Sequence, residues 1–176
     1  MSSNTTEGPP PPKKRQTYEA GCHCGYIKFS VTVSPPLPET KPLRCNCSAC
    51  RRFGYLLVYM VRKDVEWHGD SWTRLSRYQF NTKEKDQLFC GKCGASIGID
   101  FRDSYAGNHP SMFGISVRTF NGIDLDALEY RTLNGVDEVQ PAEDLSGKQY
   151  ELDERKTTSS TREEAEQELA AAAAIA

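Results

Sequence analysis

Seven cysteines gather in three short clusters, and this feature constrains the fold of the chain more than any other. The clusters are Gly21-Cys22-His23-Cys24-Gly25, Cys45-Asn46-Cys47-Ser48-Ala49-Cys50-Arg51 and Phe89-Cys90-Gly91-Lys92-Cys93-Gly94. An odd number of cysteines cannot be fully paired in disulfides, and such short spacings are typical of metal ligands. We therefore expect the cysteines to bind zinc in a reducing compartment, the cytoplasm or the nucleus.

The third cluster has the form of a zinc knuckle. Cys90 and Cys93 are separated by two residues, and Gly94 permits the tight left-handed turn that directs both sulfurs at one ion. A knuckle supplies two ligands, whereas a structural zinc takes four, so a second pair is required. If the three close cysteines of the middle cluster share their own ion, only the first cluster remains to supply that pair. The predicted structural zinc ligands are Cys22, Cys24, Cys90 and Cys93.

The middle cluster predicts a second ion with an open position, held by Cys45, Cys47 and Cys50. Three protein ligands with a vacant fourth position are typical of catalytic zinc. Three thiolates leave the complex negatively charged and weakly Lewis acidic, so it favours a soft substrate thiolate over the generation of hydroxide. The expected chemistry is thiol activation, with formation or cleavage of a carbon–sulfur bond.

Two alternatives concern the ligand sets. In one, Cys45 and Cys47 join the knuckle, which leaves Cys22, Cys24 and Cys50 without a site. In the other, a protein side chain closes the second centre; the candidates are aspartates and the three histidines, His23, His68 and His109.

Apolar patterning predicts a mainly β domain over residues 17–150. Expected strands cover 27–33, 55–61, 72–80 and 112–120, with shorter ones at 88–89 and 97–101; the apolar run 55–61 indicates a central strand buried on both faces. Short helical turns are expected at 48–52, capped by Ser48, and at 124–128. Residues 1–16 are expected to be a disordered tail. Residues 151–176 form a charged and alanine-rich tail, expected to be helical from 161 to 176.

Composition argues against two classes of protein. The formal net charge is −2, whereas duplex-binding proteins usually carry a strong basic excess, so nucleic-acid binding is not expected. No apolar run reaches the length of a membrane span, and the amino terminus does not resemble a signal peptide. The sequence does not predict an oligomeric state.

Together, the three clusters resemble the glutathione-dependent formaldehyde-activating enzyme family, which includes the centromere protein V domain. The resemblance covers most of residues 17–100 and implies an Mss4-like, β-tent fold with two zinc ions. It assigns Cys22, Cys24, Cys90 and Cys93 to the structural ion and Cys45, Cys47 and Cys50 to the catalytic ion. The count and spacing of the cysteines lead to the same two sets. It also implies a carbon–sulfur lyase that condenses glutathione and formaldehyde to S-hydroxymethylglutathione. Two positions depart from many members: Asn46 replaces a histidine, and Tyr55 follows Gly54 in place of a small residue.

The resulting hypotheses belong to three classes. The first is a zinc lyase in which Cys45, Cys47 and Cys50 form the catalytic centre. In it, Arg51 and Arg52 hold a substrate carboxylate or lie free on the surface, and Asn46 and Tyr55 line the pocket or have structural roles. The second is a non-enzymatic zinc module that binds a protein or chromatin partner, consistent with the basic Lys13-Lys14-Arg15 and the tail. The third is a redox sensor that uses the cysteine triad.

Overall fold

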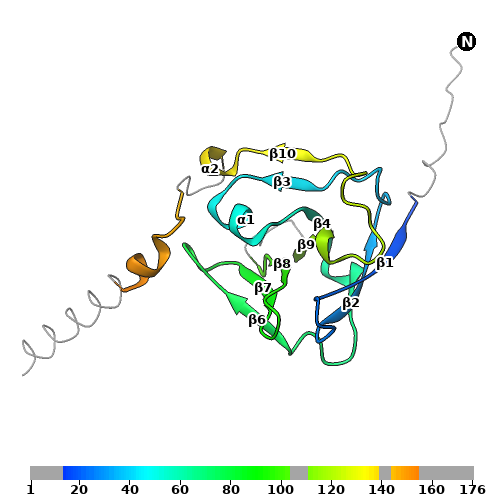
Figure 1. Ribbon diagram of the computed structural model, residues 1–176, viewed down its shortest axis with the longest axis horizontal. Helices are drawn as coiled ribbons and strands as arrows, with labels where there is room; N and C mark the ends of the chain where they lie inside the picture. Colours follow the sequence, from blue (N-terminus) through cyan, green and yellow to red (C-terminus); the bar gives the residue numbers. More distant parts are fainter. Residues whose placement is uncertain (1–13, 104–110, 139–143, 155–176) are drawn as a thin grey trace, which may run out of the picture.

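The computed structural model describes residues 14–103, 111–138 and 144–154, whose strands form two sheets (Figure 1). The smaller sheet is antiparallel, in the order β1 (Gln16–Gly21), β2 (Lys28–Val33), β5 (Val65–Trp67). The larger sheet has the order β10 (Arg131–Leu133), β3 (Leu43–Cys45), β4 (Leu57–Val61), β9 (Met112–Ser116), β8 (Ser96–Asp100), β7 (Asp86–Cys90), β6 (Leu75–Tyr78). Its pairs are antiparallel except β10 with β3.

Helix is scarce in the described residues. The α-helices are α1 (Ser48–Phe53) and α2 (Gly135–Glu138), the 3-10 turns are η1 (Arg62–Asp64) and η2 (Val117–Thr119), and residues 149–154 are also helical. The prediction of a mainly β fold is confirmed. No helix of the described residues is long and apolar enough to cross a membrane.

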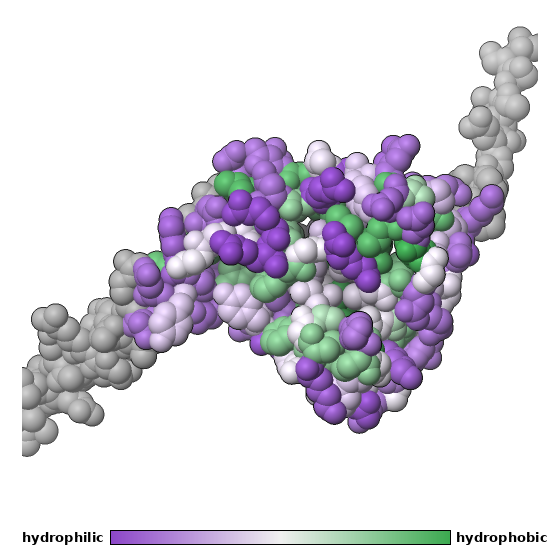
Figure 2. Space-filling view, in the orientation of Figure 1, coloured by the Kyte–Doolittle hydropathy of each residue, from purple (hydrophilic) through white to green (hydrophobic). Residues whose placement is uncertain are grey.

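The main hydrophobic core draws on both sheets, so it holds them together. Phe29 and Val31 of β2 and Leu88 and Ile115 of the larger sheet have no exposed surface. A second apolar cluster lies on the other face of β4 and includes Leu43, Cys45, Cys50, Tyr55, Leu57, Ile99 and Phe101. Because residues of β4 alternate between the two clusters, this strand is covered on both faces, as its apolar run predicted. On the face drawn in Figure 2, hydrophobic side chains reach the surface in patches between hydrophilic ones.

Several expected elements are shorter than predicted or absent. The strand expected at 72–80 spans only β6, because a turn closed by the hydrogen bond from the Arg74 amide to the Asp70 carbonyl occupies the residues before it (3.3 Å). The strand expected at 112–120 ends at Ser116, where η2 begins. Residues 124–128 form a bend and turn, not a helix. The predicted tail helix at 161–176 and most of the predicted amino-terminal tail lie outside the described residues.

Candidate metal centres and adjoining pocket

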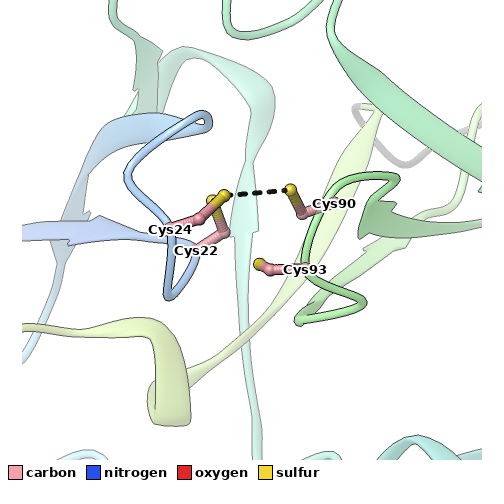
Figure 3. Close-up of side chains that lie close together, drawn as sticks. All are labelled: Cys22, Cys24, Cys90 and Cys93. Atoms are coloured by element: carbon pink, nitrogen blue, oxygen red, sulfur yellow. Dashed lines mark hydrogen bonds between the residues drawn. The ribbon is translucent and has the colours of Figure 1, made fainter.

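Four cysteine sulfurs from two separate turns converge on one point (Figure 3). Cys22 and Cys24 come from the turn after β1, and Cys90 and Cys93 from the turn between β7 and β8. The Sγ–Sγ distance is 3.6 Å between Cys22 and Cys24 and 3.8 Å between Cys24 and Cys90, and all four sulfurs lie within 4.8 Å of one another. A tetrahedral zinc with thiolate bonds of about 2.3 Å requires sulfurs about 3.8 Å apart. The spacing is therefore compatible with one zinc ion and too long for disulfides.

Both turns share one backbone design. The amides of Cys22 and Cys90 each donate to the carbonyl five residues later, at 3.0 Å, and Gly25 and Gly94 adopt φ of 74° and 73°. This left-handed conformation favours glycine, which has no Cβ to clash. The Ile27 amide also donates to Cys22 Sγ (3.2 Å), as expected for a sulfur that carries negative charge. Because one turn leaves the smaller sheet and the other belongs to the larger, an ion here would link the two sheets.

The remaining three cysteines form a second centre at the start of α1. Cys45 is the last residue of β3, Cys47 is the N-cap of α1, and Cys50 lies in its first turn. Their sulfurs lie within 4.8 Å of one another. The Cys47 amide donates to Cys45 Sγ (3.4 Å), and the Cys50 amide donates to Cys47 Sγ (3.5 Å). The prediction that Ser48 is the N-cap is therefore wrong. Cys47 is the N-cap, and its sulfur accepts a hydrogen bond from the Cys50 amide at the start of the helix.

Hydrogen bonds within the triad favour the thiolate form of Cys47. A hydrogen bond from the Cys50 thiol, together with backbone amides, lowers the pKa of Cys47 to about 5. The same hydrogen bond, burial and the nearby Cys47 charge raise the pKa of Cys50. All three cysteines must be deprotonated to serve as zinc ligands, so metal binding here would release protons. This donor set could hold a metal ion, and its thiolate chemistry is compatible with zinc.

The structure groups the seven cysteines as four and three, rather than joining Cys45 and Cys47 to the knuckle. Among the described residues, no histidine, carboxylate or further cysteine shares the triad's cluster of ligand atoms. His23 is exposed beside the other centre, and His68 follows β5, with Nδ1 4.0 Å from a Glu19 carboxylate oxygen. His109 lies outside the described residues.

The triad opens on a cavity of about 600 Å³ that carries positive charge. Its lining residues are Arg44, Cys45, Asn46, Cys50, Arg51, Gly54, Tyr55, Leu56, Arg118, Thr132, Leu133 and Asn134. Among the described residues, this wall includes three guanidinium groups and no carboxylate. We refer to it below as the thiol pocket.

The three arginines of the thiol pocket are held by their own contacts. Arg51 also contacts Asp144 (2.9 Å) and Ser146 (3.1 Å), Arg118 Nε donates to the Gly54 carbonyl (2.7 Å), and Arg44 lies over the Tyr130 ring (4.6 Å). Sequence reasoning proposed Arg51 but missed Arg44, whose position next to Cys45 was a usable signal. It also missed Arg118, which no local pattern marks. The fourth arginine near the triad, Arg52, does not line this pocket; it lines a second cavity.

Asn46 joins the triad loop to the segment between β10 and α2. Its Nδ2 donates to Asn134 Oδ1 (2.9 Å), its Oδ1 accepts from the Val136 amide (3.1 Å), and its backbone amide donates to the Leu133 carbonyl (3.2 Å). The side chain both lines the pocket and positions the loop between two cysteines. An asparagine can position the loop in this way because its side-chain amide offers a hydrogen-bond donor and an acceptor together.

Tyr55 is a structural residue of the pocket wall. It is 4% exposed, its hydroxyl donates to the Gly98 carbonyl (2.9 Å), and burial raises its pKa. Removal of the hydroxyl would leave a buried carbonyl without this partner. We expect Tyr55→Phe to lower the free energy of unfolding by about 1–2 kcal/mol, measured by chemical denaturation. Tyr150→Phe, at a 74% exposed residue, is the control and should change it by less than about 0.5 kcal/mol; an equal effect of the two changes would contradict this role.

Known proteins are similar to this chain in sequence and in fold. A curated Halomonas elongata protein named "Putative glutathione-dependent formaldehyde-activating enzyme" is 28% identical over 88 residues, which are 46% of this chain and 54% of that protein. The chain thus spans about half the length of this relative. A crystal structure of a Rhodobacter sphaeroides protein has a TM-score of 0.54 and 27% identity, over 65% of this chain and 99% of that one, consistent with the Mss4-like fold. The model of the family described as glutathione-dependent formaldehyde-activating enzyme matches residues 17–126, so the chain belongs to this family.

Proposed function

We propose that the protein is a carbon–sulfur lyase that acts on adducts of an anionic thiol, with glutathione and formaldehyde as the reference pair. The observation that carries this proposal is the position of the three-cysteine centre. Two of its cysteines, Cys45 and Cys50, line a cavity whose described wall includes three arginines and no carboxylate. A small thiol with carboxylate groups matches this pocket in both charge and chemistry.

The proposed cofactors are two zinc ions per chain. Cys22, Cys24, Cys90 and Cys93 would hold the structural ion, and Cys45, Cys47 and Cys50 the catalytic one. When bound, the second ion would supply a Lewis acid that lowers the pKa of a substrate thiol. Thiolate ligands suit zinc, whereas carboxylates and carbonyls suit magnesium and calcium.

The residues of the thiol pocket would bind and orient the substrate. The guanidinium groups of Arg44, Arg51 and Arg118 would pair with the two carboxylates of glutathione and place its sulfur toward the triad. Asn46 would keep the triad loop in place through its contacts with Asn134 and Val136. In the reaction, the thiolate sulfur attacks the carbonyl carbon of formaldehyde and a carbon–sulfur bond forms. The carbonyl π electrons move to oxygen, which takes up a proton to give the hydroxymethyl thioether.

Neutralising Arg44 should weaken substrate binding more than chemistry. In Arg44→Gln we expect KM for glutathione to rise about tenfold, the usual scale for the loss of one charge-assisted contact, while kcat changes less than about twofold. Steady-state kinetics with varied glutathione would measure both. Lys63→Gln removes one exposed charge from η1, outside the pocket, and serves as the control. Equal KM values for the two variants would contradict the assigned role of Arg44.

A further inference from the structure

A second cavity, of about 700 Å³, adjoins the opposite face of α1. Ser48, Ala49, Arg52 and Phe53 line it, whereas Cys50, Arg51 and Gly54 line the thiol pocket. This division follows from helical spacing, which places residues four apart on one face. The volume lies in the range of small-molecule sites. Among the described residues, only Tyr55 lines both cavities, and the proposed lyase chemistry uses no residue of the second cavity.

The wall of the second cavity is aromatic. Phe53, Tyr78, Phe80, Phe89 and Tyr150 supply rings from α1, from the β6–β7 region and from the carboxy-terminal described segment. The rings of Phe53 and Tyr78 meet edge to face at 6.0 Å, and those of Tyr78 and Phe80 stack at 5.8 Å. Two of these residues, Tyr78 and Tyr150, are the large hydrophobic side chains most exposed to solvent among the described residues. Such a surface favours a planar aromatic ligand.

Gln87 introduces an unsatisfied acceptor into this apolar wall. It lies on β7, and its side chain is directed to the cavity while its neighbour Leu88 packs in the main core. Gln87 is 4% exposed, and its Oε1 has no hydrogen-bond partner among the described residues. Buried polar atoms without partners are rare in folded proteins and cost free energy. A ligand that offers an O–H or N–H group would satisfy this oxygen.

Of the described residues that line the second cavity, Arg52 alone carries a charge. Among the described residues, no hydrogen bond or ion pair engages its guanidinium group, whereas the neighbouring Arg51 binds Asp144. A guanidinium group close to an apolar surface favours a carboxylate partner.

We propose that this second cavity is a binding site for a planar aromatic acid that carries a hydroxyl or N–H donor. The ring lies among the aromatic side chains, the donor pairs with Gln87, and the carboxylate pairs with Arg52. The site is separate from the thiol pocket, because Arg51 and Arg52 of α1 line different cavities and Tyr55 is the one described residue that lines both. The proposal does not depend on the lyase activity.

Fluorescence titration of the full-length protein with a hydroxynaphthoate tests this site. The methoxy analogue lacks the donor, and naphthol lacks the carboxylate; each should bind about tenfold more weakly than the hydroxynaphthoate. In Gln87→Leu, the hydroxynaphthoate should no longer bind more tightly than its methoxy analogue. In Arg52→Gln, it should no longer bind more tightly than naphthol. Thermal melting of each variant establishes that it is folded. If Gln87→Leu impairs folding, Arg52→Gln still tests the site.

Two controls separate the two cavities. Arg44→Gln and Lys63→Gln should leave hydroxynaphthoate affinity unchanged, and saturating glutathione should not displace the ligand. Displacement by glutathione, or weaker binding in Arg44→Gln but not in Arg52→Gln, would place the ligand in the thiol pocket and overturn the proposal. Absence of binding, or equal affinity for all three compounds, would overturn it as well. None of these outcomes involves catalytic activity, so a failure of this proposal is distinct from a failure of the proposed function.

Discussion

Cys90→Ser should lose the cooperative thermal unfolding transition that the wild-type protein shows. Cys90 has no exposed surface, ends β7 and lies 3.8 Å from the sulfur of Cys24, which comes from the turn after β1. A zinc bound at this centre would link the two sheets, and its binding free energy, of order 10 kcal/mol, would contribute directly to folding. The total stability of a domain is about 5–15 kcal/mol, so loss of this ion removes most of it.

Circular dichroism melting with metal analysis of the same sample would measure this effect. A strong chelator should unfold the wild-type protein in the same way, which separates loss of the ion from the effect of a buried hydroxyl. A Cys90→Ser protein that retains full metal content and melts within a few degrees of wild type would contradict the structural role of this centre.

Cys47→Ala should lose one of two zinc ions and nearly all lyase activity, yet remain folded. Cys47 is half-buried at the N-cap of a six-residue helix, and its centre lies within one loop rather than between the sheets. Loss of the cap costs about 1 kcal/mol, which a domain of ordinary stability tolerates. Two thiolates do not suffice for a stable zinc site, so the ion is expected to leave.

Zinc content per chain and thermal melting would be measured together for this variant. One ion with near-wild-type melting is the expected result. Loss of both ions would mean that the two centres are not independent. Retention of both would mean that Cys47 is not a ligand of the second ion.

The sequence predicted those features that depend on local spacing. The grouping of cysteines followed from short spacings and from counting, and the central strand followed from an apolar run that packs on both faces. Features that depend on helix phase or on distant contacts were not predictable. Arg51 and Arg52 are neighbours in sequence and lie in the last turn of α1, but they line different cavities. The cap moved from Ser48 to Cys47 because β3 ends at Cys45 and fixes where the helix begins.

Tertiary structure alone brings Arg118 and Asn134 to the triad. Arg118 lies in η2, and Asn134 follows β10, which pairs in parallel with β3. Neither residue stands in a motif, and parallel pairing between segments so far apart in sequence leaves no local signal. Arg44 and Arg51 of the thiol pocket are neighbours of its cysteines in sequence, whereas Arg118 reaches the pocket only through the fold.

A titration of the cobalt-substituted protein with glutathione tests the central claim, an open three-thiolate centre, most directly. Cobalt that occupies both centres reports a change of ligand in its visible and charge-transfer absorption. A saturable spectral change is expected in the wild-type protein and in Lys63→Gln, and no change in Cys47→Ala. A wild-type spectrum that does not respond to glutathione would contradict the account, as expected of a second centre that is closed or of a module that only binds partners.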